Sequence, residues 1–545
     1  AAFILPRNTA AGETYRNFTT DFLTELKPHP AAHYWVVDDE RTLAQDLTQA
    51  AAQHSVIRVV QWLTSKHTGA DPKGVIPYYL EKYGYHDHRH GFKYFNIDTY
   101  QLETPAPDFT AEKLTPANIN FGDQLKLTAF GLGDAGDVSA VNVAQARSKD
   151  LLWLRLSWQK TGQQPENLKV SAIVYTQNGQ LVTQVDKELL NNWWQTGSRD
   201  WDVGAQEDTY FLIPIPPATP PGDYLLKIAV YGEESLARLP VAGGGADRLT
   251  ELAPFKVAPA TKRTKPEDLT LALPAEQPLL PGLKLIGFET LPGQSVRAGQ
   301  QLGASLIWQA DDPPPAADLQ MGLVVKPKEG KDEWPISEPV GLAGPGYPSS
   351  RWRAGEMLRG WLTARIPPTL EPGIYELELR LSNAGSNKLS LPVGDFEITG
   401  WPRNFTAPRP QLPFNAEFGG LATLVGLDAD ASTLSPGGTL NARLYWRSDA
   451  EFDADYTAFV QLIGPDGALH GQVDQTPGAG QFPTTGWLPG EYLTDPYAVT
   501  LAADAPPGDY QIAIGLYNPH TGQRLPVTGN NCQPDVCLLP GLTVK

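Results

Sequence analysis

The chain has 545 residues, a formal net charge of −18, 41% hydrophobic residues and two cysteines. This acidic balance argues against nucleic acid or an anionic membrane surface as the main partner, because both are bound through basic patches. No apolar run approaches the roughly 18 residues that a membrane-spanning helix needs, so direct membrane insertion is not expected. The length favours about three or four domains.

Residues 1–103 predict a small α/β domain. The expected order is strand, helix, strand, helix and strand, at 33–38, 40–52, 56–62, about 71–84 and 92–102. Asp71 is the expected N-cap of the second helix, and Pro72 suits its first helical position. This alternation implies a small parallel or mixed sheet covered by helices. Residue 1 is Ala rather than Met, so we expect a chain processed or excised from a longer one.

The rest of the chain repeats three landmarks three times. A Pro-Gly-x-Tyr phrase that leads into an alternating run lies within residues 220–224, 371–375 and 506–510. Upstream, at nearly constant spacing, come a Trp-x-x-Gly turn at 201–204, 352–355 and 487–490 and a tryptophan at 158, 308 and 446. Three landmarks in register predict three homologous domains, at 118–257, 282–399 and 414–545.

Each repeat contains short runs with a period of two, separated by Gly, Pro, Asn or Asp. This pattern favours an antiparallel β-sandwich of the immunoglobulin or fibronectin type III kind. The predicted fold class is therefore mainly β, with a small N-terminal α/β domain followed by three tandem antiparallel sandwiches. Within the repeats we expect Trp158, Trp308 and Trp446 to anchor the cores, with ligand stacking as the alternative.

The two cysteines, Cys532 and Cys537, stand close together near the end of the chain. Three interpretations compete: a disulfide that closes a small loop, half of a metal site, and a redox pair. A metal site needs two more soft ligands, and a redox pair favours the spacing Cys-x-x-Cys. We therefore expect a disulfide, which predicts an oxidising and hence extracytoplasmic location.

A cluster of three histidines is the first candidate metal site. His86, His88 and His90 alternate, and alternate residues of an extended segment lie on one face, where three imidazoles suit zinc or a similar metal. The alternative is a solvated loop or an edge strand after Gly84.

A run of acids in the third repeat is the second candidate. Asp449, Glu451, Asp453 and Asp455 supply the oxygen ligands that calcium prefers, but the run lacks the turn glycine and final glutamate of an EF-hand loop. The alternative is an ordinary polar loop between two strands.

A group of tryptophans in the first repeat is a candidate platform for sugar rings: Trp193, Trp194 and Trp201. Packing at a domain junction is the alternative. No nucleophile elbow, phosphate loop or dinucleotide fingerprint occurs, so we nominate no catalytic residue and expect no cofactor.

Several segments resemble a known family. The α/β region, at 58–62, 68–75, 79–84 and 92–102, resembles the soluble region after the last membrane helix in some bacterial glycosyltransferases of the dolichyl-phosphate-mannose protein mannosyltransferase-like superfamily (glycosyltransferase family 39 type). The third repeat resembles the sandwich modules that follow this segment in such proteins, through its phrases at 444–447, 464–467, 487–491, 506–510 and 516–522.

The resemblance implies an accessory role rather than a reaction. In that superfamily the catalytic acid lies in a loop near the first membrane helices, and no such loop or helix occurs in this sequence. The first hypothesis is therefore a non-catalytic extracytoplasmic accessory region that positions acceptors or binds glycans, with the membrane-embedded part of the same polypeptide or another cell-surface protein as partner. The alternative is a cell-surface structural or adhesive protein whose sandwiches form a spacer. A secreted hydrolase with accessory sandwiches is a third hypothesis, without a catalytic constellation to support it.

Overall fold

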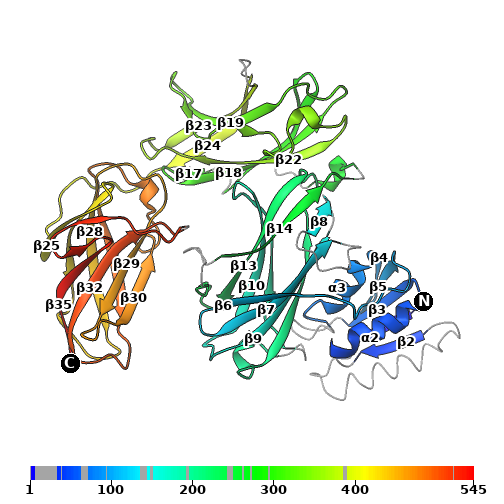
Figure 1. The fold of residues 1–545 in the computed structure, drawn as a ribbon. Coiled ribbons are helices and arrows are strands. Elements are labelled where there is room, and N and C mark those ends of the chain that lie inside the picture. The colour runs from blue at the N-terminus through cyan, green and yellow to red at the C-terminus, as the bar shows by residue number, and fades with distance from the viewer. Residues whose placement is uncertain are drawn as a thin grey trace.

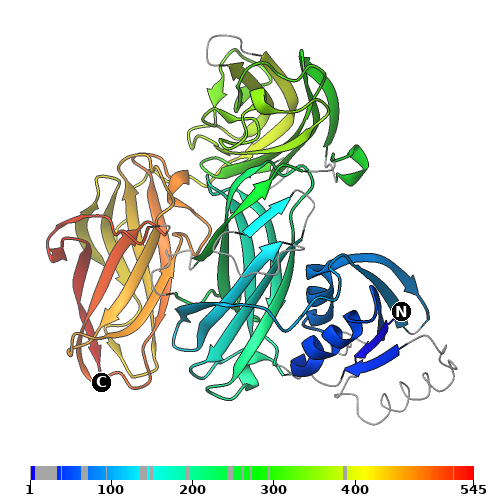
Figure 2. The ribbon, with the colours of Figure 1, turned by 45° about the vertical axis from the view of Figure 1, so that its right-hand side comes forward.

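The protein is described here from a computed structural model. It describes residues 2–6, 33–37, 40–62, 71–93, 95–134, 144–147, 151–191, 196–241, 249–260, 263–269, 273–291, 295–383, 389–519 and 521–545. Seven sheets and two helices of the described residues make a small α/β unit and three two-sheet sandwiches, so the predicted fold class is confirmed (Figures 1 and 2).

The α/β unit is a five-stranded mixed sheet in the order β2-β1-β3-β5-β4. Its elements are β1 (Ala2–Pro6), β2 (His33–Val37), α2 (Glu40–Ala51), β3 (Val56–Trp62), α3 (Val75–Lys82), β4 (Gly84–Gly91) and β5 (Phe95–Leu102). The predicted strands and helices are present. β1 was not predicted, and β4, whose residues are polar and almost all exposed, is the edge strand that was given as the alternative to a metal site after Gly84.

Helix α3 begins later than predicted but uses the predicted aspartate. Asp71 lies four residues before the helix, and its carboxylate accepts the backbone N–H of Val75 at 2.9 Å and of Ile76 at 2.8 Å. Gly74, at φ 71°, is the N-cap residue because the chain turns there through the left-handed region. Pro72 therefore lies before the helix rather than in its first position.

The first sandwich packs the sheet β11-β10-β13-β14-β8 on the sheet β12-β9-β7-β6. Its strands are β6 (Thr115–Phe121), β7 (Leu125–Asp134), β8 (Ala144–Arg147), β9 (Leu151–Lys160), β10 (Leu168–Thr176), β11 (Leu181–Glu188), β12 (Gln206–Pro214), β13 (Gly222–Gly232) and β14 (Thr250–Ala258). The short helix η1 (Ser198–Asp200) precedes β12, and η2 (Pro266–Asp268) follows the last strand.

The second sandwich has the sheets β15-β16-β18-β22 and β17-β24-β23-β19-β20, with β21 also paired to β19. Its elements are β15 (Leu273–Leu280), β16 (Leu283–Leu291), β17 (Ser295–Arg297), β18 (Gln301–Ala310), β19 (Leu319–Pro327), β20 (Trp334–Pro335), β21 (Val340–Gly341), η3 (Ser349–Arg351), β22 (Met357–Arg365), β23 (Gly373–Asn383) and β24 (Leu389–Thr399).

The third sandwich has the sheets β31-β28-β26-β25-β33 and β27-β35-β32-β29-β30, with β34 paired to β35. Its elements are β25 (Leu412–Phe418), β26 (Ala422–Ala429), β27 (Thr433–Leu434), β28 (Thr439–Ser448), β29 (Thr457–Ile463), β30 (Leu469–Gln475), η4 (Thr484–Gly486), β31 (Tyr492–Thr500), β32 (Gly508–Tyr517), β33 (Val527–Gly529), β34 (Cys532–Gln533) and β35 (Val536–Val544). Cys532 and Cys537 form the predicted disulfide between β34 and β35.

The described strands within each sandwich pair antiparallel, with one exception per sandwich. The short strands β8, β17 and β27 pair parallel with β14, β24 and β35. Each of them lies in the chain between two strands of one sheet and pairs with the edge of the opposite sheet. The same crossing at the same place makes the three sandwiches equivalent in topology as well as in sequence.

The residues of the sequence landmarks have the same structural roles in all three sandwiches. Trp158, Trp308 and Trp446 are all 0% exposed, which confirms the core-anchor prediction over ligand stacking. In the Pro-Gly-x-Tyr phrases, the tyrosine hydroxyl donates to the backbone carbonyl four residues earlier. These bonds join Tyr224 to Pro220 at 2.8 Å, Tyr375 to Glu371 at 3.0 Å and Tyr510 to Pro506 at 2.9 Å. The phrase therefore fixes how the chain enters the strand.

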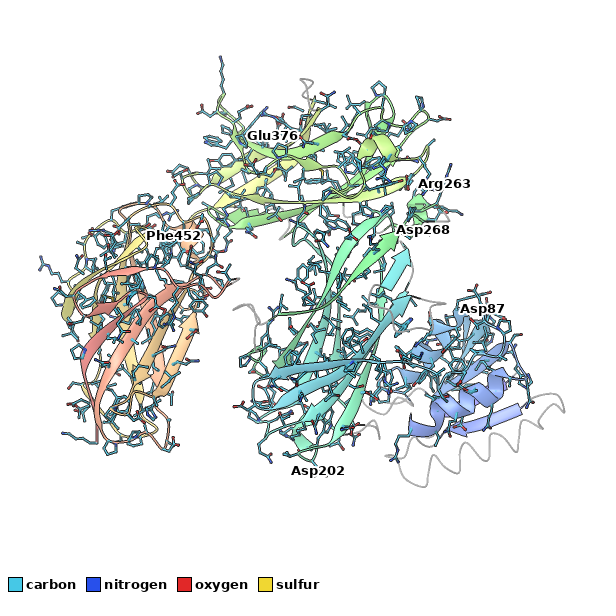
Figure 3. All side chains as sticks on the ribbon, in the orientation of Figure 1. Asp87, Asp202, Arg263, Asp268, Glu376 and Phe452 are labelled. Atoms are coloured by element: carbon cyan, nitrogen blue, oxygen red, sulfur yellow. A yellow bond between two sulfur atoms is a disulfide. The ribbon has the colours of Figure 1, made fainter. Side chains whose placement is uncertain are left out.

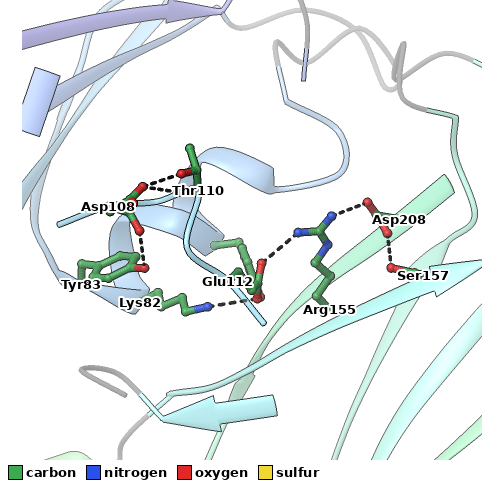
Figure 4. A network of polar contacts seen from close by, with 9 residues as sticks. Lys82, Tyr83, Asp108, Thr110, Glu112, Arg155, Ser157 and Asp208 are labelled. Carbon is green, nitrogen blue, oxygen red and sulfur yellow. Dashed lines mark hydrogen bonds and ion pairs between the residues drawn. The ribbon is translucent and has the colours of Figure 1, made fainter. Parts of the chain in front are cut away.

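The junction between the α/β unit and the first sandwich is held by a buried carboxylate (Figure 4). Glu112, from the segment between β5 and β6, accepts Lys82 Nζ at 3.0 Å and the Tyr78 hydroxyl at 2.6 Å from helix α3. Its other oxygen accepts Arg155 Nη1 at 2.9 Å from strand β9. Arg155 also donates to Asp208 at 2.8 Å. Because Lys82 and Glu112 are 1% and 3% exposed, this network ties the two units through charges shielded from water.

The second sandwich lies between the first and the third (Figure 1). Packing and hydrogen bonds hold it at both junctions. Toward the first sandwich, Ala218 packs against Ile286, Ile307 and Met357, and its carbonyl accepts the Arg359 backbone N–H at 2.6 Å.

Toward the third sandwich, the Arg403 guanidinium donates to the carbonyls of Pro368 at 3.0 Å and Gly486 at 2.7 Å. Gly299, at φ 86°, lies so close to Gly486 that a Cβ on Gly299 would come within 2.4 Å of the Gly486 Cα. The backbones of the two sandwiches are therefore in direct contact.

Candidate functional site

The three predicted metal-binding histidines lie on the exposed edge strand β4, next to β5. The pairing register shifts between His86 and His88, which breaks the strict alternation that the prediction required. His86 Nε2 lies 3.0 Å from Asp98 Oδ1, whereas His88 Nε2 lies 3.5 Å from the Thr99 hydroxyl. Since consecutive residues of a strand face opposite sides, these two imidazoles reach opposite faces of the sheet. The edge-strand alternative describes this segment.

The acids of the third repeat diverge rather than converge. Asp449 accepts Arg447 Nε at 2.6 Å and the Thr423 hydroxyl, Glu451 is exposed, and Asp455 accepts the Thr485 backbone N–H at 3.2 Å. The Asp453 backbone carbonyl accepts Arg365 Nη1 of the second sandwich at 2.7 Å. Phe452, labelled in Figure 3, is buried and packs edge-on against Trp487.

Asp455 has counterparts in the other two sandwiches. Asn167 and Asp318 occupy its place, and each accepts the backbone N–H of the second residue of the short helix η1 or η3. Asp455 does the same for η4, so its role is to cap that turn. Within the described residues no group of three His, Cys, Asp or Glu side chains is placed to hold a metal ion. The structure therefore lends no ligand geometry to either metal hypothesis.

The predicted tryptophan platform is described only in part. Trp193 and Trp194 lie outside the described residues. Trp201 is 6% exposed, and its indole N–H donates to the Thr196 carbonyl at 3.1 Å. Trp352 and Trp487 make the corresponding bonds, to Tyr347 and Phe482, so Trp201 belongs to the shared turn rather than to a binding face.

A polar depression on the third sandwich is the candidate site that the structure adds. It has a volume of about 530 Å³ and crosses the neighbouring strands β26, β28 and β31. Its polar lining consists of Gln411, Asp428, Asp430, Asn441, Arg443, Gln475 and Tyr497. Its small apolar lining includes Ala429, Ala442, Ala479 and Ala498. We call this feature the β28 depression.

The polar groups of the β28 depression are held in place by one another. The Asp428 carboxylate accepts the Gln411 backbone N–H at 2.7 Å and the Tyr445 hydroxyl at 2.7 Å. The Gln411 N–H, with the Tyr445 hydroxyl, holds the pKa of Asp428 below its ordinary value, so this carboxylate is ionised at neutral pH. Asp430 accepts the backbone N–H of Asn441 at 3.0 Å and its side-chain amide at 2.6 Å.

A buried carboxylate, Asp495, lies behind the β31 side of the β28 depression. It is 0% exposed. On β31 it directly precedes the lining residue Pro496 and shares its face of the strand with the core residue Leu493. One oxygen accepts the Gly478 backbone N–H at 2.8 Å and Gln475 Nε2 at 3.3 Å. Burial raises the pKa of Asp495 to about 6, against the lowering effect of its hydrogen bonds, the largest of them from Tyr497.

The corresponding position differs in the other sandwiches. The register of the strand pairs aligns Asp495 with Thr209 of the first sandwich and Gly360 of the second. Each of the three residues pairs with a leucine of the neighbouring strand: Leu444, Leu156 and Leu306, respectively. Thr209 accepts the indole N–H of the core tryptophan Trp158 at 3.1 Å, as Asp495 does for Trp446 at 3.3 Å. In the second sandwich the Trp308 indole nitrogen is buried without a hydrogen-bond partner. Only the third sandwich places a carboxylate here.

Sequence reasoning missed Asp495, although a signal was present. The run from Tyr492 to Thr500 alternates, so Asp495 shares its face with Leu493, Tyr497 and Val499. An acid on the inward face of a strand is rarely left unpaired and often marks a functional position. The β28 depression itself had no such signal, because its residues come from six separate segments of the chain.

The depression offers groups that can bind a polar ligand. Its carboxylates, amides and guanidinium supply hydrogen-bond acceptors and donors.

Comparison with known proteins adds little to this geometry. No family model matches the chain, and no curated protein matches it. Among solved structures, the crystal structure of the C-terminal domain of wzt overlaps 28% of this chain and 84% of that chain, at 12% identity and a TM-score of 0.19. A likeness of this degree carries no argument about ligand or function. No described helix has the length and hydropathy of a membrane span.

Proposed function

We propose that the chain is a non-catalytic extracytoplasmic accessory region that binds glycan, as its resemblance to regions of membrane glycosyltransferases implies. The observation that carries the proposal is the β28 depression, a polar recess on the sandwich that carries most of that resemblance. The Cys532–Cys537 disulfide supports an oxidising, extracytoplasmic location.

The chemistry of the depression suits a hydroxyl-rich, uncharged ligand. Each oxygen of Asp428 and Asp430 has two lone pairs, so capacity remains to accept sugar hydroxyls beside the bonds already made. The exposed Ala479 and Ala498 are small, so they leave room for a sugar ring whose hydroxyls can meet the polar side chains. The two carboxylates outnumber the single Arg443 guanidinium, which disfavours nucleic acid and other polyanions.

An array of neutral bacterial and synthetic oligosaccharides, probed with the full chain, tests this proposal. We expect binding that Asn441→Ala and Arg443→Ala each weaken about tenfold, because each removes groups that hydrogen-bond the ligand. Gln511→Ala is the matched control, since Gln511 is exposed on strand β32 of the opposite sheet. Absence of binding to every neutral glycan would sink the proposal, as would equal loss in all three variants.

A rigid cell-surface spacer is the second candidate, favoured by the pinned junctions. Glu112 and Arg403 join neighbouring units through hydrogen bonds, and Gly299 brings two backbones into contact. A spacer needs fixed geometry but no ligand, so it predicts an array without any bound glycan. Solution scattering that fits one conformation, together with an empty array, would favour this candidate over the first.

A further inference from the structure

We infer that a cavity at the junction between the first and second sandwiches binds a phosphate group, held by Arg263, Arg353 and Thr264. The site is separate from the β28 depression and stands independently of the proposed function. Its basis is that two guanidinium-bearing side chains and a buried threonine, from two different segments of the chain, line one small cavity.

Both sandwiches contribute to the walls of this cavity, which has a volume of about 140 Å³. Ala218 and Thr219 precede strand β13, Arg263 and Thr264 follow strand β14, and Arg353 lies between η3 and β22. Sites for a whole small-molecule ligand begin at roughly 300 Å³, so this cavity suits one group of a ligand, with any remainder outside.

The segment that carries Arg263 is basic, although the protein is acidic. Residues 261–266 read Thr-Lys-Arg-Thr-Lys-Pro in a chain of net charge −18. The two acids that follow are already engaged, since Glu267 Oε1 lies 3.5 Å from Lys265 Nζ and Asp268 accepts the Lys265 backbone N–H at 2.7 Å. Arg263 (Figure 3) is exposed and, within the described residues, its guanidinium has no hydrogen-bond acceptor or ion-pair partner.

The junction between the second and third sandwiches shows the contrasting case of a satisfied arginine. There Arg403, also from a connecting segment, donates to Glu491 at 2.8 Å as well as to the carbonyls of Pro368 and Gly486. Arg263 instead lies against the backbone of the second sandwich, where a Cβ on Gly355 would come within 2.8 Å of its Nη1. Its N–H groups therefore remain available to a ligand that enters the cavity.

Arg353 belongs to a turn that all three sandwiches share, but the arginine is particular to the second. It follows the landmark Trp352, and the equivalent positions hold Asp202 and Leu488. The turn itself therefore does not require an arginine. Of the guanidinium nitrogens only Nη2 approaches Glu356 Oε1, at 3.5 Å, which leaves most of the N–H donors for a ligand.

Glu356 also lines the cavity, but its carboxylate is engaged by the turn. It accepts the Arg353 backbone N–H at 2.9 Å and the Tyr347 hydroxyl at 3.1 Å. In the third sandwich Glu491 accepts the Leu488 backbone N–H at 3.0 Å in the same way. This acid therefore closes the turn, and the two guanidinium groups give the lining a net positive charge.

Thr264 supplies the third contact. It is 7% exposed, and no described residue hydrogen-bonds its hydroxyl, whereas the Thr219 hydroxyl donates to the Pro216 carbonyl at 2.6 Å. Two planar guanidinium forks and one hydroxyl call for at least three ligand oxygens. A carboxylate has two, whereas a phosphate group has more and carries more charge, and the arginine fork matches its geometry. Phosphate is therefore the group that this lining fits.

Isothermal titration calorimetry of the full chain, at an ionic strength held constant with sodium chloride, tests the site with inorganic phosphate and mannose 6-phosphate. Arg263→Ala and Arg353→Leu, the second of which copies the third sandwich, should each weaken binding about tenfold, because each removes hydrogen bonds to a charged group. Thr264→Val keeps the side-chain shape without the hydroxyl and should weaken binding less. Arg409→Ala is the matched control, since Arg409 is an exposed arginine of the connection between the second and third sandwiches.

Hydrogen exchange locates the bound phosphate. Because the ligand contacts both sandwiches, phosphate should slow exchange several-fold in peptides covering residues 216–222 and 353–359. The equivalent turn of the third sandwich, residues 484–491, should not change. In Arg263→Ala the slowing should disappear.

Three results overturn the inference: no binding of either phosphate, binding that Arg263→Ala weakens no more than Arg409→Ala does, and protection by phosphate that lies away from this junction. Arg263 is exposed, so its variant keeps the test decisive even if Arg353→Leu is unstable. With binding established, the two probes distinguish the source of the phosphate. Equal affinities indicate the free ion, and tighter binding of mannose 6-phosphate indicates a phosphate carried on a glycan.

Discussion

Asp495→Thr should change how the stability of the third sandwich depends on pH. The raised pKa, about 6 against an ordinary value of 3.8, means that the folded sandwich holds the proton more tightly than the unfolded chain. The stability contributed by this group is therefore complete below pH 3.8 and is lost as the pH rises through about 6. At about 1.4 kcal/mol for each tenfold step, the loss is about 3 kcal/mol.

Threonine at position 495 does not titrate, so the variant escapes that loss. We expect the free energy of unfolding of the variant, relative to the wild type, to increase by about 3 kcal/mol between pH 3.5 and pH 7.5. The assay is hydrogen exchange of peptides from strand β32 in increasing urea, which reports on the opening of this sandwich alone. Strand β13 of the first sandwich is the internal control, because its exchange should not change. A relative stability that is constant with pH, or that falls as the pH rises, would refute the reasoning.

Three further predictions concern the shared interior and the junctions. Glu112→Ala leaves the buried Lys82 ammonium without its carboxylate, so the free energy of undocking helix α3 should fall by about 3–5 kcal/mol. Proteolysis near that helix should then be faster, and an unchanged rate of cleavage would contradict the prediction. Tyr375→Phe removes one hydroxyl bond and should destabilise the second sandwich by about 1 kcal/mol in thermal unfolding, so a loss of several kcal/mol would be inconsistent. Gly299→Ala should force the second and third sandwiches apart at Gly486 and enlarge the radius of gyration in solution scattering, whereas an unchanged profile would show that the contact can shift.

The repeated architecture could be predicted from the sequence because its landmarks are local. The core tryptophans, the Trp-x-x-Gly turns and the Pro-Gly-x-Tyr phrases each depend on a few neighbouring residues, and their register alone predicted three equivalent sandwiches. The same landmarks also predicted which side chains lie in the sandwich cores, such as the buried Trp446. The disulfide was predictable for the same reason, since its two cysteines are five residues apart.

The candidate site could not be predicted because it depends on contacts between distant segments. Gln411 and Gln475 line the β28 depression from outside strands β26, β28 and β31, and no local sequence pattern predicts that these segments lie together. The histidine segment shows a different limit of local patterns, since one register shift in β4 separates His86 from the face that strict alternation gives it. Among the acids at 449–455, Asp455 has a structural counterpart in both other sandwiches, which only the aligned structures reveal.

The way Arg403 spans two sandwiches has a mechanical consequence. Residues 400–411 connect strand β24 to strand β25, and they are folded back against both neighbours by Arg403, Trp401 and Asn404. If the two ends of the chain are pulled apart, these side-chain bonds must break before the connection can straighten. The straightened connection would span up to roughly 40 Å, at about 3.4 Å per residue, with both sandwiches still folded. This connection would thus let the protein lengthen under load without the unfolding of either sandwich.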